Sequence, residues 1–326
     1  MKGFIFSAGY GRRLAPFTDI TPKPLMPILN TPAIVYNIAL LASMGIKEIG
    51  INLCHLGSQI RDYLGNGEDF GVRFYYSQEP EMLGTGGGIK HAEMFFDETT
   101  IILNGDVLID LRIHELLAAH KKTSAIATMV LRHDAEQEKF GTLGINEKQK
   151  VVRILEQQTS EDEIKSYMFC GAQIIEPEFL NYLPEKKISC IVRDGYQIML
   201  QEAEGLYAFI HQGCWADTGT PERYLDIQQK LLDQREELFF LDDLPPKLKR
   251  LFVDTKALTT PSLISAECQV SDKAMVESGA IIGPDVKIDA GAQIQRSILL
   301  EGARIEANQQ IKNAIVDAHH CISVSQ

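Results

Sequence analysis

The chain has 326 residues, of which 45% are hydrophobic and 23% charged, and its formal net charge at pH 7 is −12. This length exceeds one usual compact core, so we expect two domains. The negative charge argues against nucleic acid or an anionic membrane surface as the main partner, and no apolar stretch is long enough to cross a bilayer. The six cysteines lack metal-ligand spacing, which predicts reduced thiols in the cytoplasm.

Short apolar runs alternate with helical patterns over the first two thirds of the chain. Four of these runs predict strands: Gly3–Ala8, Glu48–Leu53, Val72–Ser77 and Thr100–Asn104. A helix is predicted over Thr31–Met44, which Thr31 can cap and Gly45 can end. The alternation predicts an α/β fold with a Rossmann-like, mostly parallel mixed sheet flanked by helices. Ligands of such sheets bind beyond the carboxyl ends of the strands.

The C-terminal region has a different pattern, in which aliphatic residues recur every six positions. They are Ile264, Val270, Val276, Ile282, Ile288, Ile294 and Leu300, and the phase slips near Arg296–Leu300. This period is typical of hexapeptide repeats, whose short strands stack into a parallel β-helix. The charged stretch before it contains Pro245–Pro246 and is predicted to be a connector. We therefore expect a first domain over residues 1–235, a linker over 236–260 and a repeat domain over 261–326.

A glycine-rich segment follows the first predicted strand. It reads Ser7-Ala-Gly-Tyr-Gly-Arg-Arg-Leu-Ala-Pro-Phe-Thr18, and Pro22-Lys-Pro-Leu25 comes soon after it. Backbone amides at such a turn can approach a phosphate closely, and the neighbouring basic side chains can neutralise its charge. The glycines alone would also fit a turn that binds no ligand. The segment is not a dinucleotide fingerprint, because the third glycine would fall at Leu14, and it is not a P-loop.

The whole segment resembles the signature G-x-G-x-R-L-x-P-x-T, followed by P-K-P, of the sugar-1-phosphate nucleotidyltransferases. The matching residues are Gly9, Gly11, Arg13, Leu14, Pro16, Thr18, Pro22, Lys23 and Pro24, whereas Arg12 replaces the usual threonine. The resemblance implies that Arg13 holds the β- and γ-phosphates of a nucleotide. It implies that Lys23 contacts the α-phosphate and the sugar phosphate, and that Ala8, Gly9 and Gly11 lie at the nucleotide.

Two aspartates are candidate metal ligands. Asp106 follows a predicted strand, and Asp217 lies in the segment Trp215-Ala-Asp-Thr-Gly-Thr-Pro221. Each could instead be an ordinary turn residue or belong to a helix start. Mg²⁺ is usually held by one or two carboxylates together with phosphates and water. The family carries its metal-binding aspartates in similar segments, so the resemblance implies that Asp106 and Asp217 bind Mg²⁺.

The base and the sugar are expected at two further groups of residues. The segment from Gln78 to Gly88 resembles the nucleoside-binding segment of the family, which implies that Gln78, Gly84 and Thr85 contact the nucleotide. The resemblance places the sugar at Gly141, Glu156 and Gly171. The chain departs from the family there: Glu156-Gln-Gln158 replaces Glu-Lys-Pro, and Phe169-Cys-Gly171 replaces Asn-Ala-Gly.

A nucleotidyltransferase domain followed by a short, left-handed β-helix resembles the mannose-1-phosphate guanylyltransferases. This likeness implies Mg²⁺-dependent attack of a sugar 1-phosphate on the α-phosphate of a nucleoside triphosphate, with release of pyrophosphate. GTP and mannose 1-phosphate are favoured as substrates. Transfer from UTP to N-acetylmuramate 1-phosphate or another hexose 1-phosphate stays open. We also expect a homo-oligomer, since β-helix faces commonly associate.

Two other kinds of function remain open. The chain could be a non-catalytic regulatory subunit that senses a nucleotide-sugar, although the presence of Arg13, Lys23, Asp106 and Asp217 together counts against this. Alternatively, His319–His320 at the end of the repeats could serve an acyltransferase. The repeat segment is short for the groove that such an activity needs, so we predict that it is structural.

Overall fold

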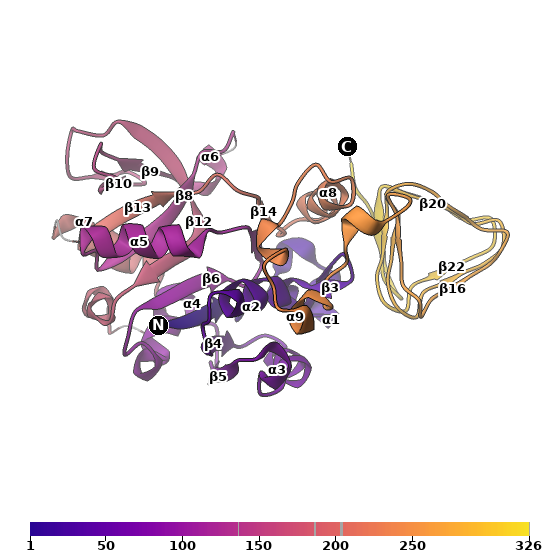
Figure 1. Ribbon diagram of the computed structural model, residues 1–326, viewed down its shortest axis with the longest axis horizontal. Helices are drawn as coiled ribbons and strands as arrows, with labels where there is room; N and C mark the ends of the chain where they lie inside the picture. Colours follow the sequence, from indigo (N-terminus) through magenta and orange to yellow (C-terminus); the bar gives the residue numbers. More distant parts are fainter. Residues whose placement is uncertain (136, 186, 203–204, 326) are drawn as a thin grey trace. The chain divides into compact units, whose positions relative to one another are not determined.

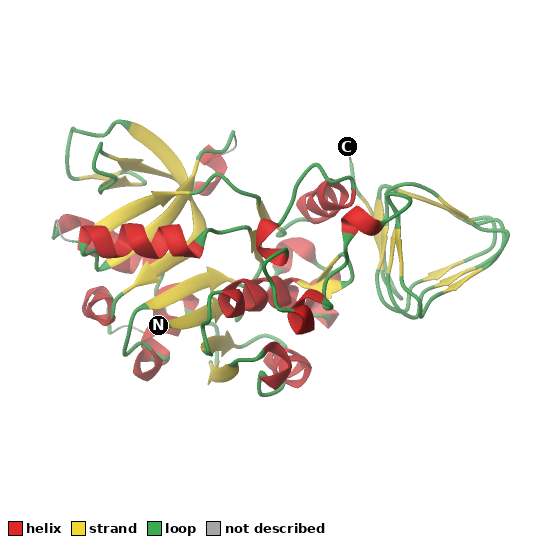
Figure 2. Cartoon of the chain, viewed as in Figure 1, coloured by secondary structure: helices red, strands yellow, loops and turns green. Residues whose placement is uncertain are grey.

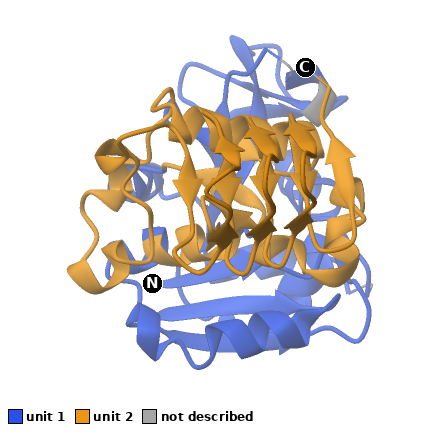
Figure 3. Ribbon diagram, turned by 90° about the vertical axis from the view of Figure 1, so that its right-hand side faces the viewer, with its two compact units in different colours: residues 1–9, 40–105, 111–215 blue, residues 10–39, 106–110, 216–326 orange. Residues whose placement is uncertain are grey.

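The computed structural model describes residues 1–135, 137–185, 187–202 and 205–325. The chain divides into two compact units, blue and orange in Figure 3, and each unit combines segments that are distant in sequence. Unit 1 comprises Met1–Gly9, Leu40–Gly105 and Leu111–Trp215, and unit 2 comprises Tyr10–Ala39, Asp106–Asp110 and Ala216–Gln326. Among the described residues, no helix combines the length and apolar character that a membrane span needs.

A ten-stranded sheet forms the centre of unit 1 (Figure 2). One side of it is parallel, in the order β6 (Thr100–Asn104), β1 (Lys2–Phe6), β4 (Glu48–Leu53) and β5 (Arg73–Gln78). All four strands were predicted, and two of them are displaced by one or two residues. In particular, β1 ends at Phe6 and not at Ala8, because Ser7 and Ala8 already belong to the loop that follows.

The other side of the sheet is largely antiparallel, so the predicted mostly parallel arrangement is wrong. The long strand β12 (Lys165–Ile175) pairs antiparallel with β6, β8 (Ala127–Arg132) and β9 (Thr142–Ile145). Short turns connect β9 to β10 (Val151–Ile154) and then to β11 (Gln157–Gln158), and strands joined by such turns run antiparallel. A parallel pair returns only at β13 (Leu206–Ile210), beside β8. The sheet is therefore mixed, as predicted, but it is not mostly parallel.

Helices flank this sheet, and some of them contribute residues to the core of unit 1 (Figure 2). They are α3 (Gly57–Leu64), α4 (Gly84–His91), α5 (Ile113–Thr123), α6 (Gln137–Phe140) and α7 (Gln197–Gln201). The core joins Phe4 of β1 and Ile102 of β6 with Ile89 of α4, all fully buried. Because α4 starts at Gly84, the predicted nucleoside segment lies where β5 ends and this helix begins.

Unit 2 contains the signature loop and the segments around both aspartates. Its elements up to the connector are η1 (Arg12–Leu14), α1 (Phe17–Ile20), η2 (Lys23–Leu25), β2 (Pro27–Ile28), β3 (Thr31–Pro32), β7 (Val107–Ile109) and α8 (Pro221–Leu232), together with the start of α2 (Ala33–Ser43) and the end of β14 (Trp215–Asp217). The predicted cap at Thr31 is wrong. Thr31 and Pro32 pair with β2, and the Thr31 hydroxyl donates to the carbonyl of Leu251 at 2.6 Å.

The predicted connector is ordered by short helices. They are η7 (Phe239–Leu241), α9 (Pro246–Lys249) and η8 (Thr255–Ala257). Phe240, Leu244 and Leu248 are buried, and the Phe240 amide donates to the carboxylate of Asp110 at 3.1 Å. Apolar contacts and this hydrogen bond therefore fix the connector to other segments of unit 2.

The C-terminal strands form stacked coils with a triangular outline (Figure 1). One row contains β15 (Leu263–Ile264), β18 (Ile281–Ile282), β21 (Ile298–Leu299) and β24 (Ala314–Val316), and β25 (Cys321–Ser323) pairs antiparallel with the last. The second row contains β16 (Gln269–Val270), β19 (Lys287–Ile288) and β22 (Arg304–Ile305). The third contains β17 (Met275–Val276), β20 (Gln293–Gln295) and β23 (Gln310–Lys312). Three parallel rows are consistent with the predicted β-helix.

The register of the coils explains the phase slip in the sequence. Ile264 aligns with Ile282, but Ile282 aligns with Leu299 and not with Leu300. The coil after the slip is thus one residue shorter, and Arg296 takes a left-handed conformation (φ 44°) where the chain tightens. Leu299 joins the buried cluster of the coils, so the predicted stacked position at Leu300 is corrected by one residue.

Candidate active site

Glycine and apolar anchors shape the signature loop. Gly11 has a φ of 65°, and a Cβ atom there would lie 3.0 Å from side-chain carbons of both Thr18 and Lys23. The Thr18 hydroxyl donates to the Gly11 carbonyl at 3.0 Å, and Leu14 is fully buried. These contacts close the loop on itself, while the Arg13 side chain stays 63% exposed. The loop is thus a fixed turn that leaves the Arg13 guanidinium accessible to a ligand.

Lys23 links the two candidate aspartates. Its ammonium donates to Asp106 Oδ2 at 2.5 Å and lies 3.5 Å from Asp217 Oδ1. The Lys23 side chain is only 6% exposed and that of Asp217 only 10%, so this interaction is poorly screened by solvent. Thr218 holds the two aspartate segments together, because its hydroxyl and its amide both donate to the Asp106 carbonyl. Residues that are far apart in sequence therefore converge within unit 2.

Two arginines complete this cluster, which we call the cation cluster: Arg13, Lys23, Asp106, Asp217 and Arg223. Arg13 Nη2 donates to Asp217 Oδ2 at 3.4 Å, and Arg223 Nη1 donates to the same oxygen at 3.2 Å. Three positive and two negative side chains leave a net charge of +1. Such a site favours an anion with several charged oxygens.

The absence of a side chain at Gly219 makes room for Arg13, whereas the sequence analysis missed Arg223. A Cβ atom at Gly219 would lie 2.5 Å from Arg13 Nη2 and 2.7 Å from Asp217 Oδ1. The spacing of Asp217 and Gly219 in the sequence therefore has a steric basis. Arg223 was not predicted as a site residue. Its position six residues after Asp217, near the start of α8, was the available signal.

The oxygen atoms of the cluster fit a hard divalent cation. Asp106 Oδ2 and Asp217 Oδ1 lie 2.5 and 3.5 Å from one ammonium, so these oxygens are no more than 6.0 Å apart. The ammonium of Lys23 supplies a positive charge between these two carboxylates. No group of three or more His, Cys, Asp and Glu side chains that could hold a metal occurs in the described part of the chain. Water and phosphate would therefore supply the remaining ligands, as in many Mg²⁺ sites.

In unit 1, a buried carboxylate connects the segments predicted to contact the nucleotide. Asn52 accepts a hydrogen bond from the Ser7 amide at 2.7 Å and donates to Glu79 Oε1 at 2.7 Å. Glu79 Oε2 accepts from the Leu83 amide at 3.0 Å. Burial raises the pKa of Glu79, although these hydrogen bonds oppose the shift. The network fixes Ser7, next to the buried Ala8 and exposed Gly9, and it fixes Leu83, next to Gly84. Its role was not predicted.

The predicted base-contact residues surround the start of α4. Gly84 has a φ of 74°, and a Cβ atom there would lie 2.5 Å from the Ser189 carbonyl oxygen. The Thr85 hydroxyl accepts from the Ile191 amide at 2.9 Å, so this side chain also orders residues 189–191. Gln78 is exposed, and its amide group donates to the Leu53 carbonyl at 3.3 Å. The buried Ser189 hydroxyl, which sequence analysis missed, has no hydrogen-bond partner among the described residues.

The three predicted sugar-contact residues all lie in unit 1. Gly141 has a φ of 82°, and a Cβ atom there would lie 2.5 Å from Leu155, the neighbour of the exposed Glu156. Gly171 lies in β12, beside Asn104 at the end of β6. A Cβ atom at Gly171 would lie 2.4 Å from the Asn104 side chain. The same strand pairs Met168 with Thr142, the residue after Gly141, so Gly171 follows that pair by three residues.

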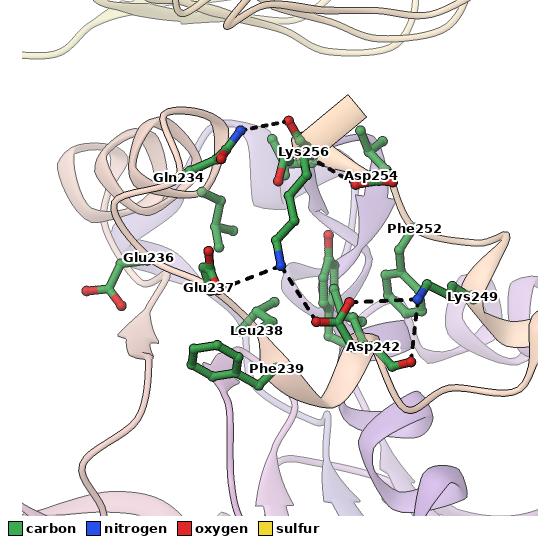
Figure 4. Close-up of a pocket in the computed structure, with 16 residues that line it drawn as sticks. Gln234, Glu236, Glu237, Leu238, Phe239, Asp242, Lys249, Phe252, Asp254 and Lys256 are labelled. Carbon is green, nitrogen blue, oxygen red and sulfur yellow. Dashed lines mark hydrogen bonds and ion pairs between the residues drawn. The ribbon is translucent and has the colours of Figure 1, made fainter. Parts of the chain in front are cut away.

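A separate pocket lies along the connector in unit 2 (Figure 4). Its lining contains none of the predicted site residues. Lys256 lies 3.8 Å from Glu237 and 3.6 Å from Asp242, and Lys249 lies 3.7 Å from Asp242. The cavity of about 180 Å³ is smaller than the roughly 300–1,000 Å³ of ordinary ligand pockets. We therefore regard it as a packing gap beside the connector.

The two histidines at the end of the repeats take part in local structure. The backbone amides of His319 and His320 both donate to Asp317, and the His320 ring lies 3.1 Å from the same carboxylate. The ring of His320 also meets that of Phe17 edge-on, at a centroid distance of 6.4 Å. These contacts give His320 a packing role against α1.

The chain matches two family models and several curated proteins. The nucleotidyl transferase model matches residues 2–234, and the model of the GMPPB C-terminal domain matches residues 258–324. A UTP–glucose-1-phosphate uridylyltransferase of Synechocystis sp. is 26% identical, over 99% of this chain and 88% of its own. Mannose-1-phosphate guanylyltransferase of Mycobacterium tuberculosis is 25% identical, over 93% of this chain and 80% of its own. The mannose-1-phosphate guanyltransferase of Debaryomyces hansenii is 29% identical, over 97% and 86%.

A solved structure shares the fold. It is a Bacillus anthracis protein, provisionally named a glucose-1-phosphate thymidylyltransferase, with a TM-score of 0.63 and 22% identity. The superposition covers 76% of this chain and 99% of the other. At this identity the likeness shows the fold alone, whereas the family model covers well over half of the sequence. The chain therefore belongs to the nucleotidyl transferase family and is a sugar-1-phosphate nucleotidyltransferase.

Proposed function

We propose that the protein transfers the guanylyl group of GTP to mannose 1-phosphate. The cation cluster is the observation that carries the proposed chemistry, because Lys23 lies between the two aspartates and Arg13 contacts one of them. The choice of substrates is supported by relatives named mannose-1-phosphate guanylyltransferases and by the match to the GMPPB C-terminal domain.

The residues of the cluster would act by positioning and by charge. Arg13 would grip the β- and γ-phosphates, since a guanidinium can donate two parallel hydrogen bonds to phosphate oxygens. Lys23 would neutralise the α-phosphate as a point charge. Asp106 and Asp217 would hold Mg²⁺, which supplies further positive charge at the phosphates when bound. Enzymes of this family generally use a divalent metal ion, which supports the assignment.

The proposed reaction is a direct displacement. A phosphate oxygen of mannose 1-phosphate forms a bond to the α-phosphorus, and the bond between that phosphorus and the oxygen bridging to the β-phosphate breaks. The bridging oxygen leaves with pyrophosphate. Since the attacking oxygen belongs to an ionised phosphate, no side chain has to remove a proton from it. This demand fits a cluster of fixed charges better than it fits a general base.

The other segments would supply specificity and architecture. Ala8, Gly9, Gly11, Gln78, Gly84 and Thr85 would contact the nucleotide, and Gly141, Glu156 and Gly171 the sugar. We propose a catalytic domain over residues 1–235, a linker over 236–260 and a left-handed parallel β-helix over 261–326. Strands in three parallel rows support this last assignment. The β-helix would associate with copies of itself to form a homo-oligomer.

Pyrophosphate release tests the proposal directly. The protein would be incubated with Mg²⁺ and each pairing of GTP, UTP, ATP or dTTP with several sugar 1-phosphates. GTP with mannose 1-phosphate should give the highest kcat/KM. Highest activity with UTP would replace it by the uridylyl alternative, which the relative named UTP–glucose-1-phosphate uridylyltransferase supports. Nucleotide-sugar binding without turnover of any pair would indicate a regulatory subunit.

A further inference from the structure

Arg223 belongs to the cation cluster although neither the sequence signature nor the family resemblance gives it a role. It lies in the first turn of α8, where its amide donates to the capping hydroxyl of Thr220 at 3.4 Å. Its guanidinium turns back to Asp217, with 3.2 Å between Nη1 and Oδ2, and the side chain is 29% exposed. The helix start thus fixes a partly buried cation at the proposed metal ligand.

The Asp217 carboxylate has more cationic partners than a metal ligand can keep. Oδ2 accepts from both Arg13 and Arg223, and Oδ1 lies 3.5 Å from Lys23. A divalent cation that binds this carboxylate competes for the same lone pairs and repels the neighbouring positive charges. Lys23 has the least freedom to move, because its side chain is only 6% exposed and contacts both aspartates. Arg13 and Arg223 both donate to Asp217 Oδ2, so they are the groups that the cation would displace.

We propose that Arg223 is a third phosphate-binding residue, which turns from Asp217 to the pyrophosphate portion of the triphosphate when a divalent cation binds Asp217. The two guanidinium nitrogens lie 3.4 and 3.2 Å from one oxygen, so they are no more than 6.6 Å apart. A pyrophosphate group can accept hydrogen bonds from both. This inference rests on the proposed nucleotidyl transfer, because that reaction brings a triphosphate to the cluster.

A purely structural arginine would behave in the opposite way. If Arg223 only braces Asp217, its removal loosens the carboxylate and weakens metal binding. If Arg223 competes with the metal and then binds phosphate, its removal takes a positive charge from the metal site and a donor from the anion site. Metal binding to the protein alone then becomes tighter, while pyrophosphate binding becomes weaker. The two roles therefore differ in the sign of the effect on metal affinity.

The full chain and its Arg223→Gln and Arg223→Lys variants would be compared in two titrations. The first follows Mn²⁺ binding without nucleotide, by the loss of the free-ion electron paramagnetic resonance signal. The second measures pyrophosphate binding by calorimetry at saturating Mn²⁺. Arg223→Gln should lower the Kd for Mn²⁺ severalfold and raise that for pyrophosphate by about tenfold or more. Arg223→Lys should keep Mn²⁺ binding near normal, because lysine retains the positive charge. It should weaken pyrophosphate binding less than Arg223→Gln does, because lysine still attracts phosphate but cannot donate two parallel hydrogen bonds to it.

Arg235→Gln is the matched control. Arg235 lies just after the same helix, pairs with Asp233 at 2.9 Å and is 53% exposed. Its loss should change neither titration. Weaker Mn²⁺ binding by Arg223→Gln, or unchanged pyrophosphate binding, would overturn the inference. Turnover of the unaltered protein, measured separately with the substrate panel, tests the proposed function itself. An active protein whose Arg223→Gln variant binds both probes normally would refute only the role of Arg223.

Discussion

The ammonium of Lys23 donates to the carboxylate of Asp106 across 83 positions of sequence, with 2.5 Å between Nζ and Oδ2. Lys23 is buried, whereas the Asp106 side chain is 36% exposed, so the pair presents its acidic partner to ligands. A buried ammonium needs a compensating charge, and Asp106 and Asp217 supply it. The arrangement holds both aspartates in place before any metal or phosphate arrives.

Replacing Asp106 by asparagine should abolish most of the activity and leave the fold intact. The asparagine carbonyl can still accept the hydrogen bond from Lys23, but it lacks the negative charge that binds Mg²⁺. We expect kcat to fall about 100-fold or more, with a small change in melting temperature. Asp233→Asn is the control, because Asp233 is similarly exposed (33%) and pairs with Arg235 away from the cluster. Near-normal turnover of Asp106→Asn would remove Asp106 from the site.

Replacing Lys23 by alanine should act mainly on the transition state. We expect kcat and kcat/KM to fall together, with KM for the triphosphate little changed, since the lysine is placed at the α-phosphate. Without the ammonium, Asp106 and Asp217 also repel each other more strongly. Mg²⁺ should therefore raise the melting temperature of this variant by more than it raises that of the unaltered protein. Lys230→Ala, which removes a surface partner of Asp226, should show neither effect. A rise in KM alone would reassign Lys23 to ground-state binding.

The sequence predicted four parallel strands and four of the five residues of the cation cluster because their signals are local. Each of Arg13, Lys23, Asp106 and Asp217 lies in a short pattern of glycine, proline and charge that follows a strand or precedes a helix. The steric need for Gly11 and Gly219, at which a Cβ atom would crowd Lys23 and Arg13, is part of that pattern. The six-residue period predicted the stacked strands for the same reason, since every short strand carries the same local signal, an aliphatic residue six positions after the last one.

Other features depend on pairings that no local pattern encodes. The antiparallel side of the sheet follows from β12, whose neighbours β6, β8 and β9 are chosen by tertiary packing. Thr31 has the residue type and position of a helix cap, but its hydroxyl donates a hydrogen bond to the carbonyl of the distant Leu251. Arg223 and Glu79 resemble ordinary helix and loop charges in the sequence. Only the fold shows that each faces a segment of the candidate site.

Glu79 should make stability depend on pH in a defined direction. Burial raises its pKa above the ordinary value of 4.5, so the folded chain retains this proton at a pH where the unfolded chain has lost it. The contribution is fully present below pH 4.5 and is lost as pH rises through the raised pKa. Glu79→Gln removes it. The unfolding free energy of the unaltered protein minus that of the variant should therefore fall as pH rises, measured by urea denaturation.

The neighbouring Glu81 provides the control for this experiment. Its side chain is 54% exposed and pairs with Lys187 at 2.5 Å on the surface. Glu81→Gln serves as the comparison, because it removes a surface ion pair and no buried carboxyl. A constant difference for Glu79→Gln would show that burial does not perturb the Glu79 carboxyl.

Gln229 should anchor the first complete coil of the repeats to α8. Its amide donates to the Gly279 carbonyl at 2.8 Å, and the side chain is 1% exposed. Gln229→Leu has a similar volume but leaves that carbonyl without its donor, which costs about 1–3 kcal/mol of unfolding free energy. Gln234→Leu is the control, because Gln234 donates to the Thr255 carbonyl at the surface. Equal losses in the two variants, measured by denaturant unfolding, would contradict a buried anchor.

Ile282 and Ile264 test whether the repeats form a packed core. They are aligned in register on neighbouring coils, yet Ile282 is fully buried and Ile264 is 47% exposed. Ile282→Asp places an unpaired carboxylate in the apolar cluster, which should cost several kcal/mol and unfold the coils. Ile264→Asp keeps its carboxylate in contact with water and should change the melting temperature far less. Circular dichroism with thermal melting would follow both variants. Similar melting curves would mean that stacking does not bury position 282, and the coils would then lack the core described above.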